Sequence, residues 1–185
     1  MIDNPTDKRL SHRIADYLPL IRATDGLTLS QVCSLSGLEP STIQNWIKRG
    51  YVPHPVEKKY RERHLARILL ITELRESMQI DRVGMLLRYV NGDADDESDD
   101  IIKEEAMYDL FCDIAQALAE DPVPPDQIGE RVSLLLDDTV ETADSAKLTT
   151  ALTVMAYTYM ANQYKRGADA LFVQNIEKDK PEKGG

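Results

Sequence analysis

The stretch TLSQVCSLSGLEPSTIQNWIKRGYVPHPVEKKYRERHLARILLITELRESMQIDRVGMLL, residues 28–87, decides the fold of this chain. Ser30 is a suitable N-cap for a first helix that ends near Leu35, and Gly37 supplies the positive φ that the following turn needs. Pro40 then opens a second helix, at the position where its missing N–H costs nothing. Two short helices joined by such a turn are typical of the helix-turn-helix motif.

The second helix of this pair has a polar outer face. The inner side of the pair is lined by apolar residues at helical spacing: Val32, Leu35, Leu38, Ile43 and Ile47. The residues that remain outside belong to the types that contact bases or phosphates in DNA grooves. The predicted DNA-binding residues of this helix are Ser41, Thr42, Gln44, Asn45, Lys48 and Arg49. The alternative is an ordinary solvated face, because helix-turn-helix shapes also occur in proteins that do not bind DNA.

A basic segment follows the second helix. Gly50 ends that helix, and Pro53 and Pro55 make the next residues unsuitable for another, so we expect a short extended wing. Four cations come directly after it, where phosphate contacts are needed. These predicted phosphate ligands, which we call the arm, are Lys58, Lys59, Arg61 and Arg63. A solvated cluster of charges is again the alternative.

The charge of the chain is unevenly distributed. The net charge of −10 over 185 residues argues by itself against nucleic acid as a partner. Residues 1–92, however, contain 14 Lys or Arg and 10 Asp or Glu, a net +4, whereas residues 93–185 contain 8 and 22, a net −14. A basic head on an acidic body suits a protein whose body repels DNA and orients the head. A solvated acidic surface without such a role explains the body equally well.

The chain divides into two predicted domains. Residues 1–92 form an N-terminal helix, kinked or split at Pro19, plus the head; residues 93–101 form an acidic linker; and residues 102–185 form a helical domain for dimerisation or sensing. Helical spacing in every long segment predicts an all-α protein with a C-terminal helical bundle. Residues 93–104 also resemble a calcium loop in their alternating carboxylates, but Ser98 stands where such a loop needs Gly, so a solvated hinge is favoured.

The last helical segment, residues 146–174, is apolar on two sides. Such a helix lies in the centre of its bundle or is shared with a second subunit, so we expect a homodimer. Tyr157, Tyr159 and Tyr164 could line the pocket of a small-molecule effector, but core packing is favoured for them. No other feature supports an effector.

The sequence lacks the signals of several other classes of protein. It contains no glycine-rich phosphate loop and no nucleophile or metal-ligand motif, so we expect no enzyme activity, no metal and no cofactor. His54 and His64 have no suitable third ligand, and Cys33 and Cys112 are predicted to be buried thiols. Because no long apolar run or signal peptide is present, a cytoplasmic protein without a membrane span is expected.

Residues 28–87 resemble the MerR superfamily of winged helix-turn-helix proteins. The matching positions include the turn glycine, the recognition-helix core, the glycine after that helix, the wing proline and the aromatic residue that closes the wing: Gly37, Ile43, Trp46, Gly50, Pro53 and Tyr60. Lys58-Lys59-Tyr60 followed by His64-Leu65-Ala66 looks closest to an uncharacterised MerR-like family of low-GC Gram-positive bacteria. The resemblance covers about a third of the chain and implies double-stranded DNA as partner and control of transcription.

The chain also departs from that superfamily. Gln44 and Asn45 stand where an Arg-Tyr pair is common, and the wing is shorter and less rich in arginine, so fewer phosphate contacts are expected. Gln and Asn still allow bidentate contacts to adenine. The sequence therefore predicts a transcriptional regulator that binds duplex DNA through residues 40–49 and the arm. The alternative is a protein-interaction adapter that keeps the head fold without binding DNA.

Overall fold

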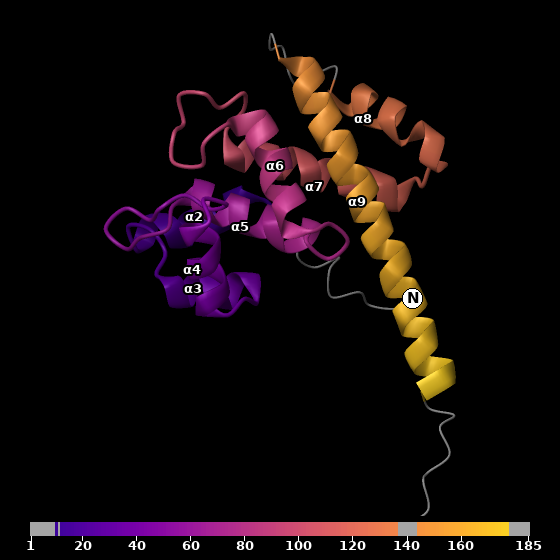
Figure 1. The fold of residues 1–185 in the computed structure, drawn as a ribbon, viewed down its shortest axis with the longest axis horizontal. Coiled ribbons are helices and arrows are strands. Elements are labelled where there is room, and N and C mark those ends of the chain that lie inside the picture. The colour runs from indigo at the N-terminus through magenta and orange to yellow at the C-terminus, as the bar shows by residue number, and fades with distance from the viewer. Residues whose placement is uncertain (1–9, 11, 137–143, 178–185) are drawn as a thin grey trace, which may run out of the picture.

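The structure is a computed structural model that describes residues 10, 12–136 and 144–177 (Figure 1). Helices and isolated β-bridges are the regular secondary structure of the described residues, with turns and irregular segments between them, so the prediction of an all-α protein is confirmed. Their elements are α2 (Ile14–Ala23), α3 (Leu29–Ser36), α4 (Pro40–Lys48), α5 (Glu62–Leu74), α6 (Ile80–Asn91), α7 (Glu104–Glu120), η1 (Pro125–Gln127), α8 (Ile128–Leu136), α9 (Ser145–Phe172) and η2 (Val173–Glu177). None of the described helices has the length and apolarity needed to cross a membrane.

Helix α2 continues through Pro19, so the expected split of this segment into two short turns does not occur. Proline removes one internal hydrogen bond, and the start of α2 is held by other groups. The N–H of Arg13 donates to Asp16 Oδ2 at 2.8 Å, and the N–H of Ile14 donates to Asp109 Oδ1 of α7 at 2.9 Å. A carboxylate distant in sequence therefore caps α2 and joins it to α7.

The contact between α2 and α7 also buries a thiol. Cys112 has no exposed surface, and burial raises the pKa of its thiol to about 12. At the edge of this contact Arg13 forms an ion pair with Asp113 at 2.5 Å. The other cysteine, Cys33 in α3, is half-buried, and burial raises the pKa of its thiol too. The prediction of a buried thiol is thus confirmed for Cys112 and only partly for Cys33.

Helices α3 and α4 form the expected pair, with one correction at its start. Thr28, and not Ser30, is the N-cap of α3: the N–H of Gln31 donates to Thr28 Oγ1 at 3.3 Å, and the N–H of Thr28 donates to Gln31 Oε1 at 2.8 Å. This reciprocal arrangement satisfies two N–H groups, whereas a cap at Ser30 would satisfy fewer. The left-handed turn at Gly37, with φ of 70°, and Pro40 at the first position of α4 are as predicted.

The wing is a very short hairpin. Val56 and Lys59 form a bridge closed by a hydrogen bond from the N–H of Lys59 to the carbonyl of Val56 at 2.8 Å. Glu57 and Lys58, between them, have φ of 51° and 62°. Two central residues with positive φ mark a type I′ turn, which usually contains Asn and Gly because other side chains are strained there. A second bridge, from Tyr60 to Leu27, fastens the wing to the start of α3.

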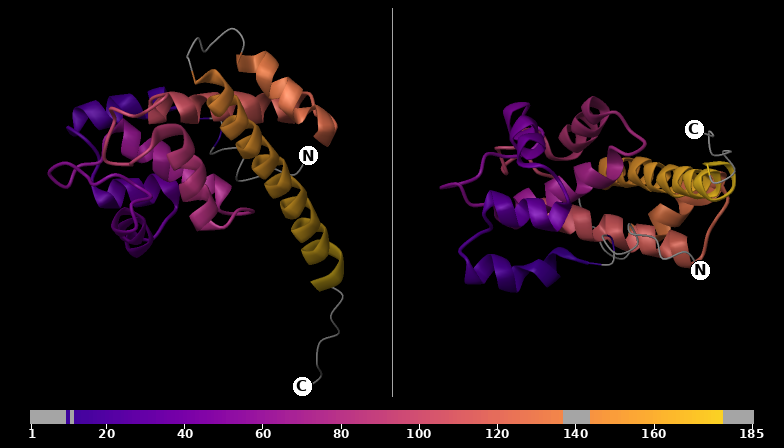
Figure 2. Two further views of the ribbon diagram at one scale, coloured as in Figure 1. Left: turned by 45° about the horizontal axis from the view of Figure 1, so that its top comes forward. Right: turned by 90° about the horizontal axis from the view of Figure 1, so that it is seen from below.

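Helix α5 is the centre of the structure. All residues from 64 to 74 are buried, and α5 packs against α2, α3, α6, α7 and α9. One hydrophobic core extends from Leu10 through α5 to Tyr159 of α9, across the position at which the linker between two domains was predicted. Figures 1 and 2 show α9 crossing α6 and α7 and then projecting beyond the other helices. The residues of 93–101 therefore lie beside a shared core and do not separate two independent ones.

Candidate nucleic-acid interface

The outer face of α4 is exposed to solvent. Ser41, Gln44, Asn45 and Lys48 are exposed, and none of their side chains has a partner among the residues that the structure describes. Thr42 is half-buried, and its N–H donates to the carbonyl of Glu39 at the start of the helix. Four polar side chains without internal partners on one helix face are available to an external partner.

The inner face of α4 is fixed to α5 by an aromatic contact. Trp46 is only 5% exposed, and the guanidinium carbon of Arg75, just after α5, lies 5.3 Å from the centre of its ring. Such a cation–π contact is attractive and leaves the cation at the surface. Arg75 is thus an exposed cation beside α4. Sequence reasoning missed it because its position depends on the packing of α5 against α4, which no local pattern encodes.

Arg49 has a structural partner. Its Nη2 lies 2.5 Å from Asp81 Oδ1 at the start of α6, and its guanidinium stacks on the ring of Tyr51 at 4.6 Å. The hydroxyl of Tyr51 donates to the same carboxylate, and this hydrogen bond, together with burial, raises the pKa of Tyr51. Arg49 therefore holds the end of α4 against α6, and its charge is already matched by Asp81.

Most of the arm is likewise paired with other groups of the protein. The ammonium of Lys59 donates to the carbonyls of Thr24 and Gly26, at 2.8 and 3.3 Å, and Arg61 pairs with Asp25 at 2.9 Å. Lys58, at the tip of the wing, is exposed and without a partner among the described residues. The sequence shows how many cations the arm contains, but not that Lys58 falls in the turn of the hairpin while Arg63 lies in the first turn of α5.

Arg63 reaches the segment that was predicted to be a linker. It pairs with Glu97, and its Nη2 donates to the carbonyl of Ala94 at 2.8 Å. His54 donates from its backbone N–H to Asp95 Oδ1 at 2.7 Å, and its ring nitrogen Nδ1 lies 2.8 Å from Asp95 Oδ2. Burial pushes the pKa of Asp95 upward, but these hydrogen bonds outweigh it and hold that pKa below its usual range. We call residues 93–100 the acidic loop.

The base of the acidic loop is buried. Arg67 and Glu104, 1% and 2% exposed, form an ion pair, and the amide of Asn91 donates to the carbonyl of Ile102 at 2.7 Å. Glu104 is the carboxylate that would complete a calcium loop, and it forms an ion pair with Arg67 inside the protein instead. No group of three His, Cys, Asp or Glu within the described ranges is placed to hold a metal ion.

His64 is a structural histidine. Its Nδ1 accepts the N–H of Arg61 at 3.0 Å, and its Nε2 lies 3.1 Å from the carbonyl of His54, to which it donates. Burial lowers the pKa of His64, which keeps the ring neutral and suits this pattern of one acceptor and one donor. Both nitrogens are used, so the ring stabilises the start of α5 and leaves no lone pair for a metal.

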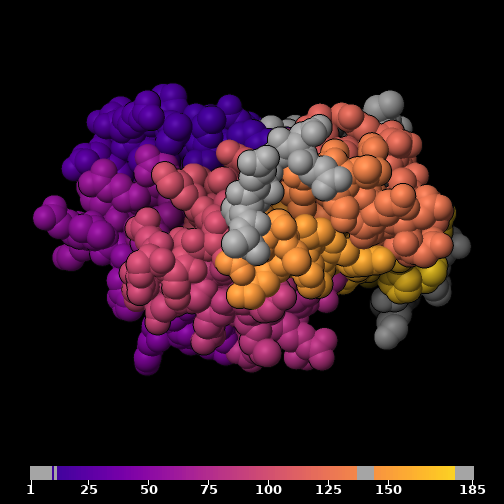
Figure 3. Space-filling view, turned by 90° about the horizontal axis from the view of Figure 1, so that it is seen from above, coloured from indigo at the N-terminus to yellow at the C-terminus, as the bar shows by residue number. Residues whose placement is uncertain are grey.

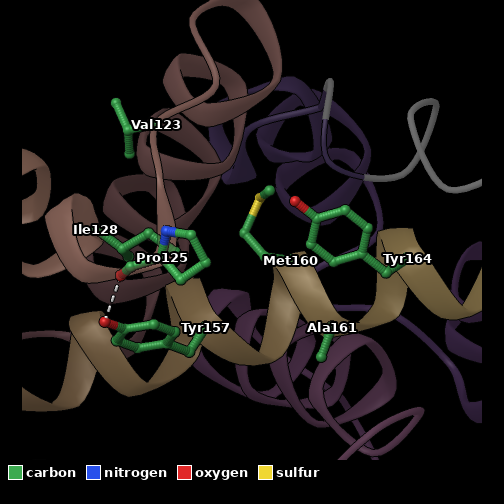
Figure 4. Close-up of a pocket in the computed structure, with 7 residues that line it drawn as sticks. All are labelled: Val123, Pro125, Ile128, Tyr157, Met160, Ala161 and Tyr164. Carbon is green, nitrogen blue, oxygen red and sulfur yellow. Dashed lines mark hydrogen bonds between the residues drawn. The ribbon is translucent and has the colours of Figure 1, made fainter.

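The three tyrosines of α9 have different environments. Tyr159 is buried and meets the ring of Phe111 edge to face, with centroids 6.4 Å apart, as core packing predicts. Tyr157 and Tyr164 line a small open groove of about 190 Å³ with Met160, and the Tyr157 hydroxyl donates to the carbonyl of Pro125 (Figure 4). This volume is below the usual range for small-molecule sites.

Comparisons with known proteins match the head and part of the body. Residues 23–111 match the family model described as "Domain of unknown function (DUF1836)". Over 100 residues the chain is 27% identical to "Uncharacterized protein YkrK" of Bacillus subtilis, and this similarity covers 52% of the chain and 43% of that protein. No solved structure matches the chain. The family match begins at the end of α2 and continues through the acidic loop into α7, so it includes the loop with the head.

Proposed function

We propose that this protein is a cytoplasmic transcriptional regulator that binds duplex DNA with a MerR-like winged helix-turn-helix head. The observation that carries the proposal is the outer face of α4, where Ser41, Gln44, Asn45 and Lys48 are exposed and their side chains have no partner within the described part of the chain. Helix α4 has about the length of a recognition helix, follows a glycine turn, and is flanked by a hairpin wing. Gln44 and Asn45 would read base edges, adenine above all.

The expected phosphate contacts are few. Lys48 and Lys58 have no partners among the described residues, and Arg75 is exposed beside α4. Three cations imply that the logarithm of the binding constant falls with the logarithm of salt concentration with a slope of roughly −3 for one head. Such a head binds weakly alone, because the phosphate contacts supply much of the affinity for DNA.

We therefore propose that two copies act together and that α9 pairs them. The projecting part of α9 exposes Tyr164, Leu171 and Phe172, which are 68%, 62% and 50% exposed. Exposed aromatic and aliphatic side chains on one helix are typical of a surface that a partner covers. Light scattering on the full chain should give the mass of a dimer, and Tyr164→Glu with Leu171→Glu should give a monomer. A monomeric parent chain at working concentration contradicts this pairing.

The test of DNA binding is a mobility-shift titration with random duplex, followed by selection of bound sequences from a random pool. If Asn45 contacts one base, Asn45→Ala should lose discrimination worth about 1 to 3 kcal/mol at a single position of the selected site. Gln127→Ala, a polar residue of η1 far along the chain, is the matched control and should bind as the parent does. The proposal fails if neither random nor selected duplex is bound at low salt.

A protein-interaction adapter is the second candidate. It is favoured by the internal pairing of Lys59, Arg61 and Arg63, which leaves the arm with little free charge. Under this reading α4 would contact a protein, and Asn45→Ala would weaken that complex. The absence of DNA binding in the titration above would leave the adapter as the better account.

A further inference from the structure

A cleft of about 470 Å³ lies between the wing and the acidic loop. His54, Arg61 and Arg63 line it from the wing side, and Asp95 and Glu97 line it from the loop. Glu62 and Glu105 complete its charged walls. Figure 1 shows both segments at the same end of the molecule, and Figure 3 shows them side by side at its surface. The acidic loop therefore lies next to the part of the head that would approach DNA.

Inside this cleft, carboxylates of the acidic loop accept hydrogen bonds from the same N–H groups that would bind an external anion. Asp95 accepts both the backbone N–H and the ring of His54, while Glu97 pairs with Arg63. A carboxylate and a phosphodiester share the same chemistry, namely acceptor oxygens and a negative charge that favour Arg and backbone N–H donors. The Nε of Arg63 is buried and has no hydrogen-bond partner among the described residues, so this guanidinium is not fully satisfied by the loop.

The acidic loop is buried at its base, whereas the two carboxylates that contact the head are exposed to solvent. At the base, Asn91 is fully buried and exchanges hydrogen bonds with the backbone of Ile102. At the tip, the side chains of Asp95 and Glu97 are 48% and 65% exposed. Exposed ion pairs contribute little stability and are screened by salt. A competing polyanion can therefore replace the tip contacts without disturbing the base.

We propose that His54 and Arg63 form a phosphodiester-binding site that the acidic loop occupies in the free protein. The loop acts as an internal competitor: it lowers the affinity of the head for DNA and leaves the cleft when a backbone phosphate enters. This inference rests on the proposed function, since it concerns the regulation of the same interface. It assigns to residues 93–100 a role in setting the affinity of the head for DNA. A segment that only connected two domains would have no such role.

The test compares two pairs of substitutions in the full chain. Asp95→Asn with Glu97→Gln removes the carboxylates that contact the head. Asp96→Asn with Asp99→Asn removes the same charge from the same loop, and the carboxylates of these two residues bond only within it. Mobility shift on a random duplex of roughly 25 base pairs, at several salt concentrations, measures both. Circular dichroism checks that both variants are folded.

The first pair should bind DNA at least about fivefold more tightly than the second, with a salt slope steeper by about 1 because Arg63 gains a phosphate. An equal gain in DNA affinity for the two pairs would mean that the loop acts only through general repulsion between its negative charge and DNA. That result would overturn the site at His54 and Arg63 but not DNA binding itself. If no variant binds DNA at low salt, the proposed function fails, and the proposed role of the acidic loop as an internal competitor fails with it. Hydrogen exchange adds a direct reading: residues 93–100 should exchange faster in the DNA complex, and slower exchange contradicts displacement.

Discussion

The outer face of α4 and the arm are close in sequence, and both are polar, but they have opposite relations to the rest of the protein. The side chains of Gln44, Asn45 and Lys48 of α4 have no partner among residues 10, 12–136 and 144–177, whereas Lys59 and Arg63 of the arm are bonded to carbonyls or carboxylates. The more basic segment is thus the less available one. The difference teaches that the count of cations in a segment does not measure the charge it offers to a ligand.

This comparison predicts where substitutions cost stability and where they cost binding. The largest loss of stability is expected at the buried end of the basic segment. Glu104→Ala leaves the guanidinium of Arg67 buried without its partner, so the free energy of unfolding should fall by about 3 to 5 kcal/mol in urea titrations. The double change of Arg67→Met with Glu104→Leu should recover part of this loss. A loss below about 1 kcal/mol for Glu104→Ala would show that the pair is not buried in solution.

Two adjacent lysines give the next effect. Lys59→Met removes the charged donor to the carbonyls of Thr24 and Gly26 and should lower the free energy of unfolding by about 1.5 to 3 kcal/mol. Lys58→Met is the matched control, and its effect should stay within about 0.5 kcal/mol. Urea unfolding followed by circular dichroism measures both. Equal effects at the two positions would contradict the described orientation of the arm.

The wing offers a change that should stabilise the protein. Glu57 and Lys58 adopt positive φ, and Glu57→Asn with Lys58→Gly supplies the residues that a type I′ turn prefers. The free energy of unfolding should rise by about 1 kcal/mol, because the strain of two side chains is relieved. Thermal unfolding should show a higher midpoint. A lower midpoint would mean that the hairpin has another turn geometry in solution.

The acidic loop should make stability depend on pH. Burial, reinforced by the charge of Glu104, raises the pKa of Asp100 to about 6 despite the nearby Arg63 and Arg67. The folded state therefore binds this proton more tightly than the unfolded state, and that stabilisation is present below pH 4 and lost as the pH rises through about 6. Asp100→Asn should thus stabilise the protein at pH 7, by less than about 1 kcal/mol because this half-buried carboxyl is partly screened by solvent, and have no effect at pH 4. Urea titrations at both pH values measure this, and equal effects contradict it.

The smallest change in stability is expected on α4. Gln44→Ala and Lys48→Ala remove exposed side chains that have no partner in the part of the chain that the structure describes, so the free energy of unfolding should stay within about 0.5 kcal/mol of the parent. If these variants lose DNA binding while remaining as stable as the parent, the outer face of α4 serves binding alone, in contrast to the arm. A loss of more than about 1 kcal/mol would show that the outer face of α4 is packed against another part of the chain.

The features that were predicted from the sequence are local ones. The turn at Gly37, the start of α4 at Pro40 and the exposure of Gln44 and Asn45 follow from backbone preference and helical spacing, which act over a few residues. The capping box of Thr28 is local too, since Gln31 follows three residues later, but Ser30 is an equally good N-cap residue by type, and the sequence alone favours neither.

The features that could not be predicted depend on contacts between distant residues. Asp109 caps α2 across 95 residues of sequence, and Arg63 meets Glu97 and Ala94 only after α5, α6 and the acidic loop have packed. An acidic segment such as 93–101 looks like a linker because its own composition gives no core. The buried pair of Arg67 and Glu104 beneath it, and the core shared by α5 and α7, are properties of the whole fold.

The two thiols are buried to different extents, so the rates at which they are alkylated report how often different parts of the protein open. Cys112 is sealed between α2 and α7, so an alkylating reagent reaches it only in molecules in which these helices have separated. Cys33, half-buried in α3, needs only a local movement of the head. The rate of labelling at each position therefore reports how often its own region opens, and the ratio of the two rates distinguishes fluctuation of the head from unfolding of the entire chain.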